Sequence, residues 1–201
     1  MYFMDGSRGV QYMKKSNGCM SYYLWVTLII FCLRCLLSNA KAITDFSLYD
    51  IYGYMGEAVL LTMIFVTLYD KIIWRYNPLG KTPVLYKKYS GTFVSDYDSV
   101  RRDASLEIEQ TWSTVRVTFI SGESRSDSVT ASLEKVMGEW QLTYCYLNKP
   151  KAIVRNRSEI HYGTATLIVN DRNFLEGQYY TDRKTIGDMI FTPAQDQYKQ
   201  I

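Results

Sequence analysis

The chain has 201 residues, 18 of them tyrosine, and a formal net charge of only +3. From Lys81 onward, basic and acidic side chains are nearly equal in number. This balance excludes a general DNA- or RNA-binding surface, which needs a clustered basic face, but it allows a small anionic ligand held by two or three cations. The length suits one compact domain with an appendage.

The first predicted element is an apolar helix from about Met20 to Leu37. At a rise of ~1.5 Å per residue, a helix of this length just crosses a bilayer core of ~30 Å. A cleaved signal peptide that begins at Lys14 and Lys15 is the alternative. Arg34 interrupts the apolar run and a second apolar segment follows it, and both observations favour a span that is retained.

The second predicted helix runs from about Met55 to Trp74, and its centre, residues 58–69, carries no charge. Trp74 and Tyr76 lie where aromatic side chains anchor a helix at the membrane surface. A buried helix of a soluble domain is the alternative. Two apolar segments in tandem favour a two-helix transmembrane hairpin over residues 20–76.

Lysine and arginine residues predict how this hairpin is oriented. They are frequent in residues 1–19 and 75–88, whereas the loop Asn39–Gly53 has only Lys41 beside two aspartates. Basic residues favour the cytoplasmic side of a membrane. We therefore expect residues 1–19 to form a cytoplasmic tail and both termini to lie in the cytoplasm.

Two charged residues, Arg34 and Glu57, fall inside the predicted spans. An ionised side chain in mid-bilayer costs ~2.5–3.5 kcal/mol even on the milder insertion scale. In an antiparallel hairpin the two lie at similar depth, which predicts an ion pair. Alternatively, Arg34 reaches the membrane surface while Glu57 faces a neighbouring subunit, or both side chains reach the surface.

After a turn-like linker at residues 77–87, residues 88–201 alternate between polar and apolar in short runs, which is typical of β-strands. The runs that we interpret as strands are Lys88–Val94, Ser105–Trp112, Thr114–Ser121, Ser128–Val136, Glu139–Tyr146, Glu159–Val169, Phe174–Thr181 and Ile186–Phe191. Short connections and the lack of a helical period predict an all-β domain, an eight-stranded antiparallel up-and-down β-barrel. A β-sandwich is the alternative. A barrel of this size can just hold one small ligand.

No catalytic constellation stands out. His161 is the one histidine, and Cys32 and Cys35 lie inside an apolar run without a second pair of zinc ligands. Nucleophile elbows, Walker loops and paired glycine-rich motifs are missing. The sequence therefore predicts a binding module rather than an enzyme, without catalytic residues, metal or cofactor.

A motif near the C-terminus, G-x-Y-x-T-x-R-x-x-x-G, contains Gly177, Tyr179, Thr181, Arg183 and Gly187. The first four alternate onto one strand face. A tyrosine offers a π-face for a base, worth ~1–3 kcal/mol per stacked base, and an arginine offers a planar fork for phosphate oxygens. Alternatively, Tyr179 fills the barrel core and Arg183 forms a surface ion pair.

Strand alternation alone adds Arg116 and Tyr144 as candidates for the barrel interior. The connector from Asn148 to Ser158 is rich in lysine and arginine. It is either a lid over an anionic ligand or a solvated loop.

The final third of the chain, HYGTATLIV followed by LEGQYYTDRKTIGDMIF, resembles the two-transmembrane, β-strand-rich effectors associated with SMODS-type nucleotidyltransferases (CD-NTases) in CBASS anti-phage defence. The order of two spans before a compact barrel is similar too. The resemblance implies that the barrel binds a cyclic dinucleotide made by a partner CD-NTase synthase after infection. The implied ligand contacts are Tyr179, Thr181, Arg183, Arg116 and Tyr144.

The same resemblance implies that ligand binding promotes self-association, and that the clustered helices disrupt the bacterial inner membrane and cause abortive infection. Two other functions stay open. The chain could be a tethered, lipocalin-like carrier of an apolar small molecule, or an adaptor whose barrel docks another membrane protein.

Overall fold

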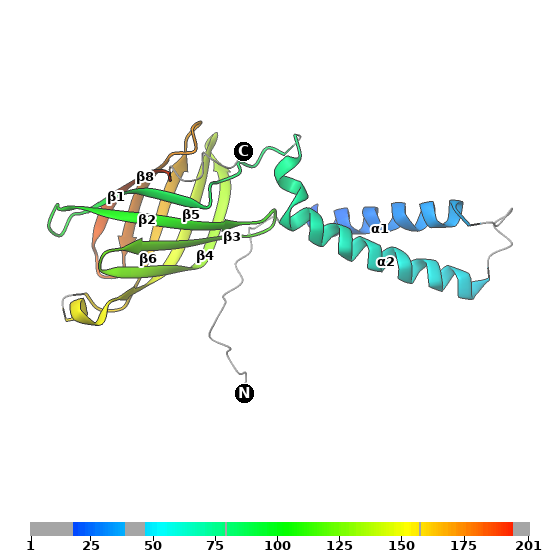
Figure 1. The fold of residues 1–201 in the computed structure, drawn as a ribbon, viewed down its shortest axis with the longest axis horizontal. Helices are drawn as coiled ribbons and strands as arrows, with labels where there is room; N and C mark the ends of the chain where they lie inside the picture. Colours follow the sequence, from blue (N-terminus) through cyan, green and yellow to red (C-terminus); the bar gives the residue numbers. More distant parts are fainter. Residues whose placement is uncertain (1–17, 39–46, 79, 157, 195–201) are drawn as a thin grey trace. The chain divides into compact units, whose positions relative to one another are not determined.

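The computed structural model describes residues 18–38, 47–78, 80–156 and 158–194 (Figure 1). The predicted basic tail therefore lies almost entirely outside the described residues. The chain divides into a helical unit, Lys15–Gly80, and a β-strand unit that begins at Lys81. Each unit is described by itself.

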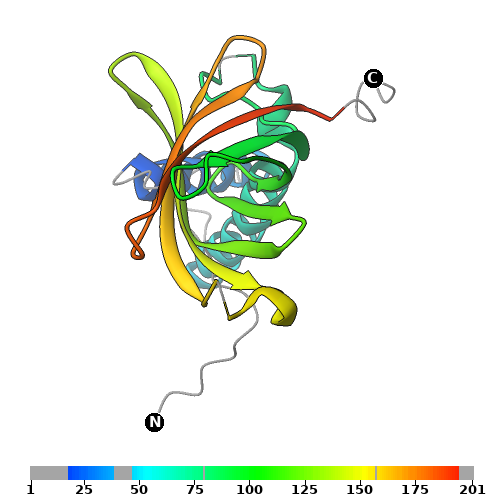
Figure 2. The same ribbon diagram turned by 90° about the vertical axis from the view of Figure 1, so that its left-hand side faces the viewer.

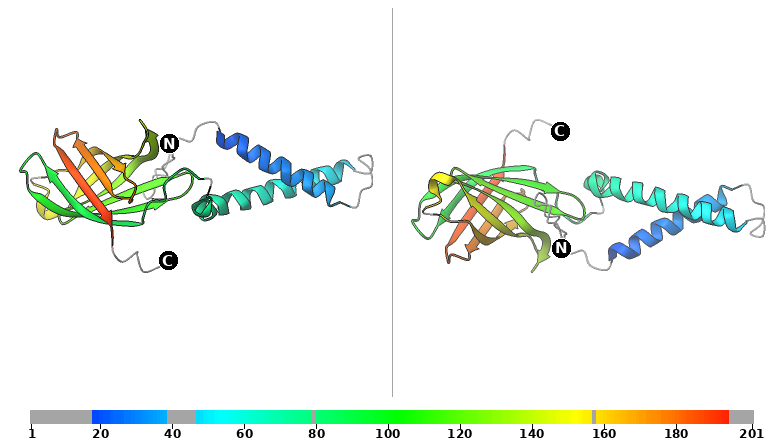
Figure 3. Two further views of the ribbon diagram at one scale, coloured as in Figure 1. Left: turned by 90° about the horizontal axis from the view of Figure 1, so that it is seen from above. Right: turned by 90° about the horizontal axis from the view of Figure 1, so that it is seen from below.

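The helical unit contains α1 (Gly18–Leu36), α2 (Leu48–Lys71) and the short 3-10 helix η2 (Ile73–Tyr76), and α1 and α2 pair as can be followed in Figure 3. Helix α2 begins seven residues before the predicted span. The reason is a capping box, in which the Asp50 backbone N–H donates to Ser47 Oγ at 3.1 Å and the Ser47 N–H donates to Asp50 Oδ2 at 3.0 Å.

By length and composition, α2 is the one helix in the described part of the chain that could cross a membrane. The apolar part of α1, Tyr22–Leu36, is shorter. The transmembrane hairpin therefore stays a prediction, supported for one helix only.

Polar side chains join the two helices at two levels. Thr27 Oγ1 donates to Thr62 Oγ1 at 3.1 Å, and Arg34 Nε lies 2.6 Å from Glu57 Oε2. The guanidinium of Arg34 also lies 4.4 Å from the centre of the Tyr54 ring. The two charged residues singled out in the sequence thus lie together as an ion pair.

The β-strand unit is a closed barrel of eight sequential antiparallel strands, as predicted, and β1 completes the ring by pairing with both β2 and β8 (Figures 1 and 2). This closure rules out the β-sandwich. The strands are β1 (Lys88–Ser95), β2 (Arg101–Gln110), β3 (Val115–Ser121), β4 (Ser124–Val136), β5 (Glu139–Pro150), β6 (His161–Val169), β7 (Leu175–Thr181) and β8 (Ile186–Pro193).

Three strands extend four residues further than predicted, all toward the same end of the barrel. Strand β2 starts four residues early, β4 starts four residues early and β5 ends four residues late. In these extensions the inward positions hold polar residues, such as Arg102, Ser126 and Asn148. The polar–apolar alternation therefore disappears although the backbone ladder continues.

The opposite end of the barrel is filled. Its inward side chains are apolar and almost fully buried: Leu106, Ile108, Val115, Val117, Leu133, Leu142, Leu167, Leu175 and Phe191. The segment before β1 covers this end, because Gln110 accepts from the Leu85 N–H at 2.9 Å and donates to the Pro83 carbonyl at 3.0 Å. Burial of Tyr89 there raises the pKa of its hydroxyl to about 12.

Candidate functional site

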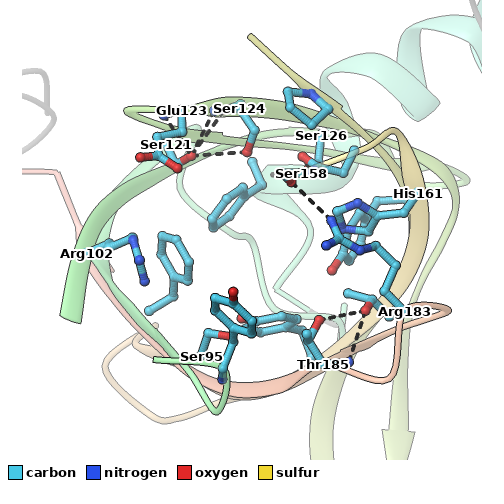
Figure 4. A pocket seen from close by; sticks show the side chains of 18 of the residues that line it. Ser95, Arg102, Ser121, Glu123, Ser124, Ser126, Ser158, His161, Arg183 and Thr185 are labelled. Atoms are coloured by element: carbon cyan, nitrogen blue, oxygen red, sulfur yellow. Dashed lines mark hydrogen bonds between the residues drawn. The ribbon is translucent and has the colours of Figure 1, made fainter. Parts of the chain in front are cut away.

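The unfilled end of the barrel holds a cavity of about 670 Å³, lined by side chains from all eight strands (Figure 4). Its mouth is formed by the β1–β2, β3–β4, β5–β6 and β7–β8 connections. Small-molecule sites span roughly 300–1,000 Å³. The cavity therefore has the volume of a ligand site rather than of a packing defect.

Two tyrosine rings lie along the cavity wall because a glycine faces each of them on the next strand. Tyr146 pairs with Gly163, where an added Cβ would lie 2.4 Å from the tyrosine Cζ and Oη. Tyr179 pairs with Gly187, where an added Cβ would lie 2.6 Å from the tyrosine Cε1. Both rings thus lie against the neighbouring strand on the inner side of the barrel, and both residues border the cavity.

Burial raises the pKa of the Tyr146 and Tyr179 hydroxyls, so both stay neutral at physiological pH. A hydrogen bond to Ser95 acts in the opposite direction on the Tyr179 hydroxyl. The Tyr179 ring also packs edge-on against Phe93, with ring centres 6.4 Å apart. The two tyrosines thus provide apolar faces and hydrogen-bonding groups without negative charge.

Two arginines reach the cavity from opposite sides of its mouth, as Figure 4 shows. Arg102, on β2, forms a bidentate pair with Asp98 of the β1–β2 loop; one of its bonds, Nη1 to Oδ1, is 3.0 Å long. This pairing lowers the pKa of the Asp98 carboxyl to about 2. Arg183, in the β7–β8 turn, donates from Nη1 to Ser158 Oγ at 3.3 Å.

The inner wall of the cavity carries buried polar groups. Ser126 Oγ donates to Asn148 Oδ1 at 2.8 Å, and both side chains are buried. The Tyr144 hydroxyl is also buried, with the side chain 1% exposed, and it has no hydrogen-bond partner among the described residues. An unmade bond of this kind costs roughly 1–3 kcal/mol, so a ligand group or water that reached this hydroxyl would be stabilised.

Residues 81–193, which include all eight strands, match the family described as the Cap15 cyclic dinucleotide receptor domain. The chain belongs to the Cap15 family. It is 31% identical over 180 residues to CD-NTase-associated protein 15 of Staphylococcus schleiferi, covering 87% of this chain and 95% of the relative. It is also 34% identical over 134 residues to the protein of the same name from Yersinia aleksiciae, covering 62% of this chain and 63% of that relative.

The Cap15 match confirms the resemblance inferred from the last third of the sequence. The protein carries a cyclic dinucleotide receptor domain and is CBASS-associated. A receptor domain agrees with the expected binding role, and a cyclic dinucleotide is the ligand class that its family description states.

Within the Cap15 domain, four of the five sequence candidates line the cavity: Tyr144, Tyr179, Thr181 and Arg183. Arg183 lies in the turn beyond the end of β7 rather than on the strand itself. Tyr179 combines both roles considered for it, since it is 8% exposed, packs in the core and still borders the cavity.

The prediction that Arg116 faces the interior is wrong. Val115 and Val117 on either side of it are fully buried inside the barrel, so the pleat of β3 places Arg116 outside. There it faces Glu109 across the β2–β3 ladder, with Nη1 3.8 Å from the carboxylate.

The β5–β6 connector borders the cavity with Val154 and Ser158, and none of its basic residues that the structure describes lines the cavity. Lys149 lies 3.9 Å from an Asp127 oxygen, and Lys151 Nζ donates to the Gly122 carbonyl at 2.6 Å. The connector thus contributes to the mouth, but these lysines are engaged elsewhere.

Three cavity residues are not identified by the sequence pattern: Arg102, Asp98 and Tyr146. Arg102 and Asp98 precede the predicted start of β2, so no alternation pattern covered them. Tyr146 shares the inward face of β5 with Tyr144, and this alternation could have identified it. His161 lies at the cavity, with Nδ1 2.8 Å from the Glu159 carbonyl oxygen.

Proposed function

We propose that this Cap15 protein is a membrane-anchored sensor whose barrel cavity binds a cyclic dinucleotide during phage infection. One observation carries the proposal: the cavity brings together two arginines on opposite sides and two tyrosine rings along its wall. A cyclic dinucleotide has two phosphodiester charges and two bases. The numbers and types of groups in the cavity match those of the ligand.

The residues have distinct roles in this proposal. Tyr146 and Tyr179 stack on the bases, each contact contributing ~1–3 kcal/mol. Arg102 and Arg183 bind phosphate oxygens, for which a planar guanidinium is suited. Thr181 and the unpartnered Tyr144 hydroxyl offer hydrogen bonds to sugar or base.

The helical unit completes the proposed mechanism. The apolar α2 supports anchoring in the inner membrane, and the excess of basic residues flanking the predicted spans supports cytoplasmic termini. The barrel then meets a nucleotide made in the cytoplasm by a partner CD-NTase synthase. Ligand binding promotes self-association, and the clustered helices disrupt the bilayer and cause abortive infection.

The test uses the full chain in lipid nanodiscs, titrated calorimetrically with cyclic di-UMP, cyclic UMP-AMP, cyclic di-AMP and cyclic di-GMP. We expect at least one of them to bind and Arg183→Ala to weaken it by roughly 10-fold or more, the loss of a charge-assisted bond. Failure of all four to bind would refute the proposed ligand class. Binding of oleate instead would favour the apolar carrier.

The membrane step is tested with the same protein in dye-loaded vesicles of phosphatidylethanolamine and phosphatidylglycerol. We expect dye release only when the cyclic dinucleotide identified by calorimetry is added. If the protein binds this nucleotide but releases no dye, the proposed receptor function stands and the proposed membrane-disrupting function is refuted.

A further inference from the structure

Arg102, at the cavity mouth, is already bound to an anion. The Asp98 carboxylate engages Nη1 and Nη2 of Arg102, and the Val100 carbonyl accepts a further bond from Nη1 at 3.2 Å. A guanidinium has five N–H donors, so only the Nε side and one hydrogen on Nη2 are left among these contacts. Both side chains are partly exposed to the mouth, Arg102 by 31% and Asp98 by 29%.

Asp98 is held beside Arg102 by the backbone of its own loop. Its carboxylate accepts from the Val100 N–H at 3.2 Å. Two residues earlier, Asp96 ties the loop to β8, because its N–H donates to the Ile186 carbonyl at 2.9 Å and its carboxylate accepts from the Ile186 N–H at 3.0 Å. The loop backbone therefore holds the carboxylate beside Arg102.

We propose that Asp98 is a built-in counter-ion that competes with a ligand phosphate for Arg102 and so raises the nucleotide concentration needed for a response. The proposal rests on the proposed function, because it assigns a regulatory role within the same cavity. A phosphate at Arg102 must either displace the carboxylate or share the guanidinium with it. In both cases the negative charge of Asp98 opposes binding, and Glu123 at the same mouth adds a second carboxylate near Arg102.

The variant Asp98→Asn tests this directly, since it removes the charge and keeps an oxygen that can accept from Val100. We expect its dissociation constant for the bound cyclic dinucleotide to fall on the order of 10-fold in 50 mM NaCl, as expected for removing one nearby like charge at intermediate dielectric. The gain should shrink in 300 mM NaCl because salt screens the repulsion. Asp98→Ser, which also accepts a hydrogen bond, provides a second variant if the first unfolds.

The matched control is Asp171→Asn. Asp171 lies exposed in the β6–β7 turn, away from the cavity mouth, and its carboxylate forms no ion pair in the described part of the chain. This variant removes the same formal charge, and we expect a gain of about twofold or less. All variants are full-length protein in nanodiscs, titrated with the four cyclic dinucleotides named above.

Four results would overturn the counter-ion role. Unchanged affinity in Asp98→Asn would show no competition, and weaker binding would show that Asp98 positions Arg102 for the ligand instead. An equal gain in Asp171→Asn would assign the effect to net charge. Wild-type protein that binds none of the four nucleotides would refute the proposed function itself, and the counter-ion role would be refuted with it.

Discussion

Replacing Gly163 with alanine tests whether the Tyr146 ring is a stacking surface of the cavity. The added Cβ would lie 2.4 Å from the tyrosine Cζ and Oη. Non-bonded carbon atoms pack best at about 3.5–4.0 Å, so the ring must withdraw by roughly 1 Å or more. Because the obstructing atoms are at the far end of a side chain, the ring rather than the backbone moves, and it moves into the lumen.

The structure predicts a larger effect of this change on binding than on folding. A displaced ring forfeits a stacking contact of ~1–3 kcal/mol, which weakens binding by roughly 5–150-fold. Overpacking costs ~1–3 kcal/mol of folding free energy, and the lower unfolded-state entropy of alanine offsets ~0.4–1 kcal/mol of it. A net loss near ~1 kcal/mol lowers the Tm of a barrel of this size by roughly 5 °C.

The assay combines calorimetric titration of the full chain in nanodiscs with thermal unfolding followed by tyrosine and tryptophan fluorescence. Tyr146→Phe keeps the ring and serves as the control, for which we expect binding within about threefold of wild type because the π-face is preserved. Tyr146→Leu removes the ring and should bind as weakly as Gly163→Ala. Wild-type affinity in both Gly163→Ala and Tyr146→Leu would refute the stacking role.

Three further predictions concern stability and the membrane step. In Gly177→Ala, the added Cβ would lie 1.9 Å from the Thr166 carbonyl oxygen, so the backbone of β6 or β7 must shift. We expect thermal unfolding to show a Tm lower by roughly 10 °C or more. The pKa of Asp98 is lowered to about 2 in the folded chain, so its pair with Arg102 stabilises the fold above pH ~4 and is lost as pH falls toward ~2. The unfolding midpoints of wild type and Asp98→Asn, measured against pH, should therefore converge at the acid end, and a constant difference down to that pH would contradict the pairing. Glu57→Gln removes the carboxylate of the interhelical ion pair, and we expect unchanged nucleotide affinity with reduced vesicle leakage; unchanged leakage would leave the pair without a functional role.

The alternation of polar and apolar residues, together with short connections, was enough to predict the barrel. Apolar residues alternate with polar ones along β3 and β5, and the structure buries Val115, Val117, Leu142 and Tyr144 on the inner face. Short connections then required sequential antiparallel neighbours. The motif at the end of β7 identified Tyr179 and other cavity residues because its alternation continues to the strand end.

The polar–apolar alternation does not reveal the strand ends at which the inward residues are polar. At the cavity end of β2, β4 and β5, the lumen side chains include Arg102, Ser126 and Asn148, so the strands could not be followed in the sequence. Arg116 was assigned to the wrong face, although its neighbours already indicated that it points outward. The signal is weakest at the functional end of the barrel because a ligand site replaces the apolar contacts that produce it.

The amino-acid sequence by itself determined the number of strands, their up-and-down order and two apolar helical segments, since these follow from residue periods within single elements and from the short connections between them. Only the tertiary structure decided which residues meet at the cavity. Strand register places Tyr146 beside Gly163 and Tyr179 beside Gly187. The path of the β1–β2 loop places Asp98 beside Arg102. Register is a relation between strands that is set when the barrel closes, so no single stretch of sequence contains it.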